Sequence, residues 1–172
     1  MKTLYSFSFL LLIFFFSSCK KTTITPIDFS KITVADSSCI YIGDVDTTDW
    51  TYDATWTAQE ISFMNFADTI SITDSATGYI QLSAPCPNPN GGVFILGMNT
   101  ERQCKMKLVC VNTAMHILYY TSRKFTGGPI VTAYDFSSLT AFHKNANYRF
   151  YYGFYNSKDS LYYKGHGDFR IE

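Results

Sequence analysis

From Asp68 onward the chain repeats one pattern, in which short runs rich in Val, Ile, Tyr and Phe are separated about every ten residues by turn-forming residues. Short, evenly spaced runs of this kind are typical of a sandwich or barrel and disfavour an α/β enzyme scaffold. We therefore predict an all-β fold, an antiparallel β-sandwich. The predicted strands are residues 69–73, 79–83, 92–98, 103–112, 116–122, 130–136, 148–155 and 161–171.

One short helix is predicted before these strands. Thr57 stands three residues before Glu60, which is the spacing of a capping box. Ile61 and Met64 supply an apolar stripe for a helix that ends near Phe66.

Trp50 and Trp56 both precede this helix, and their role has two interpretations. They line a binding patch, or they pack the helix over one end of the sandwich. We favour packing, because aromatic side chains bury large areas and a domain of this size needs them.

The composition excludes several classes of protein. The 172 residues are 47% hydrophobic and 17% aromatic, which is a globular composition. Basic and acidic side chains number 14 each, so the chain lacks the positive field of nucleic-acid binders and we expect no nucleic-acid partner. No phosphate-binding glycine loop or nucleophile elbow occurs in the sequence. We therefore expect neither a cofactor nor enzymatic activity.

The N-terminus has the pattern of an export signal, in which Lys2 is followed by an apolar run at 9–16 and then by Ser17, Ser18 and Cys19. Small residues directly before a cysteine resemble the lipobox of bacterial lipoproteins, although Phe16 stands where Leu is usual. One alternative is an uncleaved anchor, but the uncharged stretch is about 17 residues, the lower limit for crossing a bilayer as a helix. An ordinary secreted protein is the other alternative.

The lipoprotein resemblance implies cleavage before Cys19, a diacylglyceryl thioether on its thiol and acylation of the new amino group. Two or more acyl chains anchor a protein firmly in a membrane. The aromatic-rich signal followed by Lys20 and Lys21 is similar to signals of Bacteroidetes lipoproteins, and Lys20 favours the outer membrane without deciding the leaflet. The expected organisation is a signal peptide at 1–18, a lipid-anchored flexible tether at 19–36 and a single sandwich domain at 37–172.

A second resemblance covers residues 86–172. The Pro-Asn-Pro turn at 87–89 before an alternating strand, and the Asp-Phe-Ser-Ser-Leu step at 135–139, are similar to immunoglobulin-like modules that end proteins exported by the type IX system of Bacteroidetes. This resemblance implies an immunoglobulin-like sandwich. The chain end at 170–172 lacks the basic finish of such sorting tails, so no sorting function is carried over.

Besides Cys19, the chain contains Cys39, Cys86, Cys104 and Cys110, which permit two disulfides in an exported protein. Cys104 and Cys110 lie on one face of a predicted strand, about 20 Å apart, whereas a disulfide requires Cα atoms within about 7 Å. We therefore expect each of them to pair with Cys39 or Cys86. The alternative is that Cys104 and Cys110 are reduced core residues.

His116, His143 and His166 are scattered, and no Cys-x-x-Cys spacing occurs, so no metal site is expected. His166 and Asp168 share a strand face and are candidates for a base and the group that orients it. Because glycines stand beside them, we favour a bulge or a closely approached backbone instead.

Aromatic side chains concentrate in one predicted hairpin. Alternation places Phe150, Tyr152 and Phe154 on one strand face and Tyr151 and Tyr155 on the other. One face must be core. The other packs against the tryptophan segment or forms a stacking platform for glycan.

Four tripeptides at predicted loops or strand edges resemble the Asp-Ser/Thr-hydrophobic acceptor of O-glycosylation in Bacteroidetes. Turns are also rich in Asp, Ser and Thr because these side chains form hydrogen bonds with nearby backbone groups. The candidate acceptors are Thr47, Thr69, Ser75 and Ser160.

Together these features predict a cell-envelope lipoprotein with a structural or partner-binding role. Its expected partners are the membrane, through the lipid, and an envelope protein or glycan. The alternative is a carbohydrate- or peptidoglycan-binding module, which a contiguous patch of exposed aromatic side chains would favour.

Overall fold

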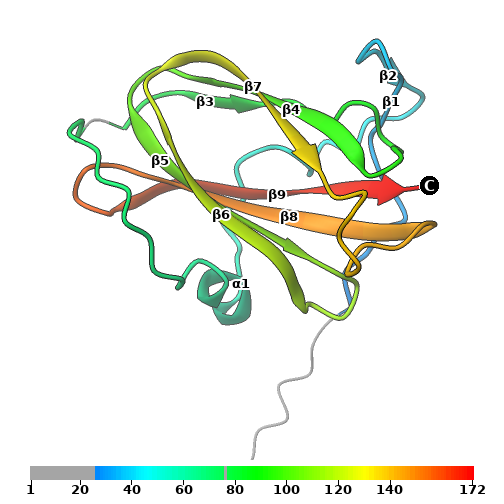
Figure 1. Cartoon of the computed structure of the whole chain (residues 1–172). Helices are drawn as coiled ribbons and strands as arrows, with labels where there is room; N and C mark the ends of the chain where they lie inside the picture. The colour runs from blue at the N-terminus through cyan, green and yellow to red at the C-terminus, as the bar shows by residue number, and fades with distance from the viewer. Residues whose placement is uncertain (1–25, 76) are drawn as a thin grey trace, which may run out of the picture.

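A computed structural model describes residues 26–75 and 77–172. Two antiparallel sheets pack face to face as a sandwich (Figure 1). The three-stranded sheet has the order β3-β4-β7 and the four-stranded sheet the order β6-β5-β8-β9. The strands are β1 (Val34–Ala35), β2 (Tyr41–Ile42), β3 (Ile80–Leu82), β4 (Val93–Thr100), β5 (Cys104–Val111), β6 (Ile117–Phe125), β7 (Gly128–Asp135), β8 (Ala146–Tyr155) and β9 (Leu161–Ile171), and the helix is α1 (Ala58–Ser62).

The strand order and one corner define the sandwich as immunoglobulin-like. Counted along the chain, the first, second and fifth strands of the sandwich (β3, β4 and β7) form one sheet. The third, fourth, sixth and seventh strands (β5, β6, β8 and β9) form the other sheet. At the start of β8 the His143 N–H donates to the Tyr148 hydroxyl at 2.6 Å, and that hydroxyl donates to the His143 carbonyl at 3.3 Å. A tyrosine bonded back to the preceding loop in this way is the tyrosine corner of such sandwiches. The predicted all-β sandwich with one short helix is confirmed.

The core between the sheets follows the predicted alternation. On β5 the predicted inward face is confirmed, because Cys104, Met106, Leu108 and Cys110 are all fully buried. Aromatic rings of β8 and β9 lie beside them in the same sheet, and the Phe94 ring of β4 meets them from the opposite sheet. The largest are Phe94, Phe150, Tyr152, Phe154 and Phe169.

The outer face of the four-stranded sheet is buried as well. Tyr151 packs against Trp56 and Phe63, with ring centroids 5.5 and 5.3 Å apart. In Figure 1 α1 and its flanking segments lie below this sheet. This second aromatic face is therefore a packing surface, and the alternative of a glycan-stacking platform at Tyr151 is wrong.

The helix begins as predicted and ends earlier. The capping box is present, since Thr57 Oγ1 accepts from the Glu60 N–H at 3.3 Å and Glu60 Oε2 accepts from the Thr57 N–H at 2.6 Å. The helix stops at Ser62, because the Lys107 ammonium of β5 donates to the carbonyls of Met64 and Phe66 at 3.1 and 2.7 Å. These carbonyls are held in an extended segment across the sheet.

The predicted strand at 69–73 is wrong. The Thr73 N–H donates to the Gln103 side-chain oxygen at 2.7 Å, and the Ile70 N–H donates to the Asp68 carboxylate at 3.0 Å. Side chains thus satisfy backbone groups that a neighbouring strand would otherwise pair, and the segment stays irregular.

The folded part of the chain extends into the predicted 19–36 tether. Thr33 and Ala35 are buried, and Ala35 exchanges two backbone hydrogen bonds of 2.8 Å with Asn88. The packed domain therefore starts before residue 37.

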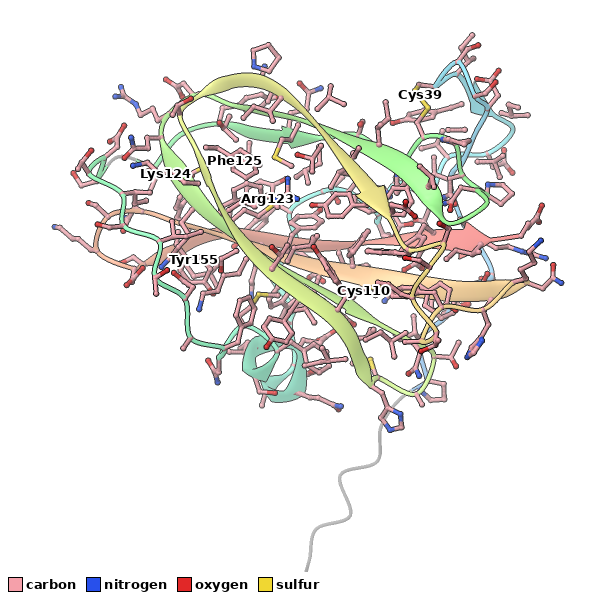
Figure 2. All side chains as sticks on the ribbon, in the orientation of Figure 1. Cys39, Cys110, Arg123, Lys124, Phe125 and Tyr155 are labelled. Atoms are coloured by element: carbon pink, nitrogen blue, oxygen red, sulfur yellow. A yellow bond between two sulfur atoms is a disulfide. The ribbon has the colours of Figure 1, made fainter. Side chains whose placement is uncertain are left out.

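The disulfide differs from the expected pairings. Cys39 is bonded to Cys86 across a separation of 47 residues, at the upper right of Figure 2, while Cys104 and Cys110 are free and buried. The expectation that Cys104 and Cys110 pair with the other two is wrong, and their alternative as reduced core residues holds. A Cys39–Cys86 bond forms alone here, so it does not require the bond between Cys104 and Cys110 that strand geometry excludes.

The free edge of β9 is closed by an upstream segment. The Trp50 N–H donates to the His166 carbonyl at 2.7 Å, and the Asp53 N–H donates to the Lys164 carbonyl at 2.9 Å. The Trp50 ring stacks on Tyr152 at 6.1 Å and fills the space that a side chain at Gly167 would need. A Cβ atom at Gly167 would lie 2.2 Å from this ring, which is the closely approached backbone favoured from the sequence.

We predict that Gly167→Ala lowers the free energy of unfolding by about 2 kcal/mol or more, because the new methyl group collides with the Trp50 ring. Urea unfolding measures the change. Gly91→Ala is the matched control, since nothing lies within 4 Å of a Cβ atom there. Equal stabilities of the two variants would contradict this packing.

Candidate functional site

The most concentrated group of buried charges lies on the outer face of the four-stranded sheet. Arg149 of β8 and Asp168 of β9 are directly opposite in the ladder. The guanidinium donates twice to the Asp168 carboxylate, at 2.6 and 2.7 Å. Asp49, just before the segment that closes β9, accepts the Asp168 N–H at 3.1 Å. One cation thus faces two buried carboxyl groups.

His166 lies on the same face and does not pair with Asp168. Its Nδ1 atom is 3.1 Å from the Asp53 carboxylate, and its Nε2 atom is 4.0 Å from Asp49 Oδ1. The less favoured interpretation, in which His166 pairs with Asp168, is therefore wrong, because His166 contacts Asp53 and Asp168 is bound by Arg149.

Burial determines the charges of this cluster. Burial, reinforced by the Asp168 carboxylate, raises the pKa of Asp49 to about 8. Burial also raises the pKa of Asp168, but the two bonds from Arg149 favour its charged form. Burial and the Arg149 charge lower the pKa of His166. At neutral pH Asp49 therefore carries a proton while His166 is neutral.

Asp49 leaves one oxygen unused. Its side chain is only 1% exposed, and Oδ1 has no hydrogen-bond partner among the described residues. A protonated carboxyl group at this place tolerates burial better than a carboxylate would.

Two adjoining grooves of about 320 and 400 Å³ border the cluster and share Asp28 and Arg149. The first groove has more apolar than polar wall, and the second has mostly polar walls. The first is lined by residues such as Gln59 and Glu60, and the second by residues such as Lys31 and Asp46. Such walls can bind a polar ligand through hydrogen bonds. Within the described ranges no group of three or more His, Cys, Asp or Glu side chains is placed to hold a metal ion.

A second buried ionic group fixes the segment after α1. Lys105 and Lys107 of β5 both contact the Asp68 carboxylate at 3.3 Å, and Lys105 also contacts Asp159 at 2.5 Å. Lys107 is further held by two backbone carbonyls. These interactions satisfy both ammonium groups, so we assign them a structural role.

The one small group of exposed aromatic side chains that we find in the described part of the chain lies beside β9. Tyr52 contacts Tyr163 with ring centroids 5.5 Å apart, and Tyr52 is more than half exposed. Burial and the neighbouring Tyr79 raise the pKa of Tyr163, and Tyr79 is also exposed.

An uncovered apolar surface lies on the outer face of the three-stranded sheet. Val93 and Ile95 of β4 and Val131 of β7 are exposed there, and Ala133 lies opposite Ile95. The Cys39–Cys86 disulfide holds the apolar β1–β2 ribbon beside this face, because Cys86 pairs with Ile95.

The residues singled out from the sequence do not converge on one site. Cys19 lies outside the described residues. Thr47, Thr69, Ser75 and Ser160 are exposed and lie outside the strands and the helix. The segments that carry Thr69, Ser75 and Ser160 approach one another, because Lys105 bridges Asp68 and Asp159 and the Ser157 N–H donates to the Asp74 carbonyl, whereas Thr47 lies in a separate loop. His116 and His143 are exposed and distant in the fold from His166.

Arg149, Asp49 and Asp53 were missed by the sequence analysis. Arg149 and Asp168 are separated from the turn between β8 and β9 by nearly equal numbers of residues. The register of this hairpin could therefore have predicted that they lie opposite each other. No comparable signal marked Asp49, which reaches the cluster from a loop over a hundred residues away in the chain.

Comparison with known proteins gives no assignment, because no protein-family model and no curated protein sequence matches the chain. In the described part of the chain no helix is long and apolar enough to cross a membrane.

We predict that Asp49→Asn removes part of the pH dependence of the free energy of unfolding. An acid whose pKa is raised by folding stabilises the protein most at low pH, and this contribution is lost as pH rises toward the folded-state pKa of about 8. Above about pH 7 His166 is neutral in both states, so the free energy of unfolding should fall by up to about 1.4 kcal/mol per pH unit between pH 7 and 8.

Denaturant unfolding between pH 7 and 8 measures this slope, which Asp49→Asn should flatten. Asp44→Asn, at an exposed position in the same loop, should leave it unchanged. A parallel slope in wild type and Asp49→Asn would show that Asp49 is ionised in the folded protein.

Proposed function

We propose that the protein is a cell-envelope lipoprotein that is anchored by a lipid on Cys19 and presents its sandwich to a partner in the envelope. The observation that carries the binding role is the uncovered apolar face of the sheet β3-β4-β7. Contiguous exposed apolar surface marks interaction sites on soluble domains. The opposite sheet is covered on both faces by the chain itself, so the two sides of the sandwich are unequal.

The anchor is supported by the sequence around Cys19, with its apolar run, its small residues and its cysteine in lipobox order. The outer membrane is the compartment that Lys20 favours. A disulfide between Cys39 and Cys86 agrees with an oxidising compartment outside the cytoplasm.

A carbohydrate- or peptidoglycan-binding role is the second candidate, and the exposed side chains of Tyr52 and Tyr79, beside the half-buried Tyr163, favour it. Most other aromatic side chains are used in packing. Retention of the domain on isolated peptidoglycan that is lost in Tyr52→Ala would support this candidate over a protein partner.

We predict that Cys19→Ala abolishes incorporation of labelled palmitate by the full chain in a Bacteroidetes host and releases the protein from the membrane fraction. The thiol is the only site for the thioether lipid, and stable attachment needs its acyl chains. Protease treatment of intact cells reports which side of the membrane the domain faces. Equal labelling of wild type and Cys19→Ala would disprove the anchor.

We predict that a photoreactive residue in place of Ile95 forms adducts with an envelope protein in intact cells, because Ile95 lies in the middle of the uncovered face. The matched control is Lys158, which is exposed in the turn between β8 and β9. Adducts from Ile95 alone support the proposed role. No adducts, or the same adducts from both positions, would count against it.

A further inference from the structure

The two sheets of the sandwich are joined along one side by a short turn between their edge strands. β6 is an edge strand of the four-stranded sheet, β7 is an edge strand of the three-stranded sheet, and only Thr126 and Gly127 connect them. A groove of about 560 Å³ is lined by residues of both strands on this side. In Figure 2 Arg123, one of the lining residues, lies between β6 and β7.

Arg123 projects from the face of β6 that is turned toward the other sheet. Its ladder partner on β5 is Met106, whose side chain is fully buried in the core. Because β6 is an edge strand, the Arg123 side chain still reaches solvent. Its guanidinium lies 5.6 Å from the centroid of the Tyr134 ring of β7. Among the described residues this guanidinium has neither an ion pair nor a hydrogen-bond acceptor.

The Tyr134 hydroxyl also lacks a partner. Tyr134 is only 3% exposed, and its oxygen has no hydrogen-bond partner in the described part of the chain. Burial raises the pKa of this hydroxyl and the nearby Arg123 charge opposes the rise, so the hydroxyl keeps its proton at neutral pH. Buried hydroxyl groups are mostly hydrogen-bonded, because an unpaired one has lost water without compensation. Two neighbouring donors therefore lack an acceptor that the described chain does not supply.

The walls of the groove suit an organic anion better than a bare ion. Among the described residues that line it, none is acidic. Ser122, Thr126 and Thr132 contribute hydroxyl-bearing side chains, and the Ser122 oxygen is buried without a partner. Ile130 adds apolar wall, and a volume of about 560 Å³ is in the range of small-molecule sites.

We propose that this groove binds a sugar acid, with its carboxylate on Arg123 and Tyr134 and its hydroxyl groups along the serine and threonine side chains. A guanidinium forms two parallel hydrogen bonds with a carboxylate, and a phenol can donate a third. One cation matches one carboxylate in charge, whereas a phosphate monoester would keep an uncompensated negative charge. The site goes beyond the partner-binding role of the uncovered apolar face, which does not depend on it.

The test titrates sodium glucuronate into the full chain in detergent, with ionic strength held constant by sodium chloride. Isotope-labelled arginine gives one Nε–H signal per side chain in NMR spectra, and Arg123→Gln identifies the Arg123 signal. We expect a saturable shift of this signal. The signal of Arg102, which is also exposed, should stay unchanged.

Three variants distinguish a built site from general attraction of anions to basic side chains, with calorimetry as the readout. Arg123→Gln should abolish binding. Lys124→Gln removes an equal charge from the next residue and should keep the dissociation constant within about twofold, because Lys124 projects from the opposite face of β6, across from Lys105. Tyr134→Phe should weaken binding about tenfold, since it removes one hydrogen bond to a charged group.

Urea unfolding of Tyr134→Phe checks the role of the hydroxyl independently. This variant should be as stable as the wild type or more stable, because the hydroxyl has no partner to lose in the folded protein. A clear loss of stability would show that the hydroxyl is held within the fold, and would overturn its assignment to the ligand.

No saturable shift of the Arg123 signal, or equal loss of binding in Arg123→Gln and Lys124→Gln, would overturn the site. Acetate bound as tightly as glucuronate would overturn the sugar acid as its ligand. Tighter binding of N-acetylaspartate would do the same and assign the site to an acidic protein side chain. The adducts expected from Ile95 depend on none of these outcomes, so failure here is distinct from failure of the proposed function.

Discussion

The rest of the structure depends on the insertion of the Trp50 ring into the space beside Gly167. Trp50 adopts a left-handed backbone conformation with φ of 60°, which costs about 1 kcal/mol, and its buried ring offsets that strain. Because this insertion closes the β9 edge, the following residues are led across the outer face of the four-stranded sheet. Trp56, α1 and the Lys107-bound segment can then bury that face.

This arrangement makes the two sheets unequal. The four-stranded sheet has a core on each face and a cluster of buried charges where the closing segment meets β8 and β9. The three-stranded sheet has a core on one face only and exposes valine and isoleucine on the other. The asymmetry supports the proposal that the three-stranded sheet binds the partner, and the polar cluster holds the closing segment against β8 and β9. It also explains why so many aromatic residues are present yet so few are exposed.

Much of the fold could be read from local patterns, while most long-range features could not. Alternation predicted β5, β8 and β9 because one face of each strand meets the core, and Thr57 with Glu60 predicted the start of α1. Alternation on β5 predicted only one buried face, yet on the opposite face Lys105 is buried and Lys107 is half-buried, because Asp68 approaches from a distant segment. The irregular path at 69–73 also depends on a distant side chain, because Gln103 accepts the Thr73 N–H that a neighbouring strand would otherwise pair.

Hydrogen exchange at two backbone amides tests most directly whether the closing segment is part of the core. The account predicts that the Trp50 and Asp53 amides, bonded to β9 at 2.7 and 2.9 Å, exchange as slowly as amides of the β8–β9 ladder. Exchange of these two amides at the rate of an exposed loop, with the ladder still protected, would contradict it. The segment would then lie loosely on the sandwich, and the covered face would need another explanation.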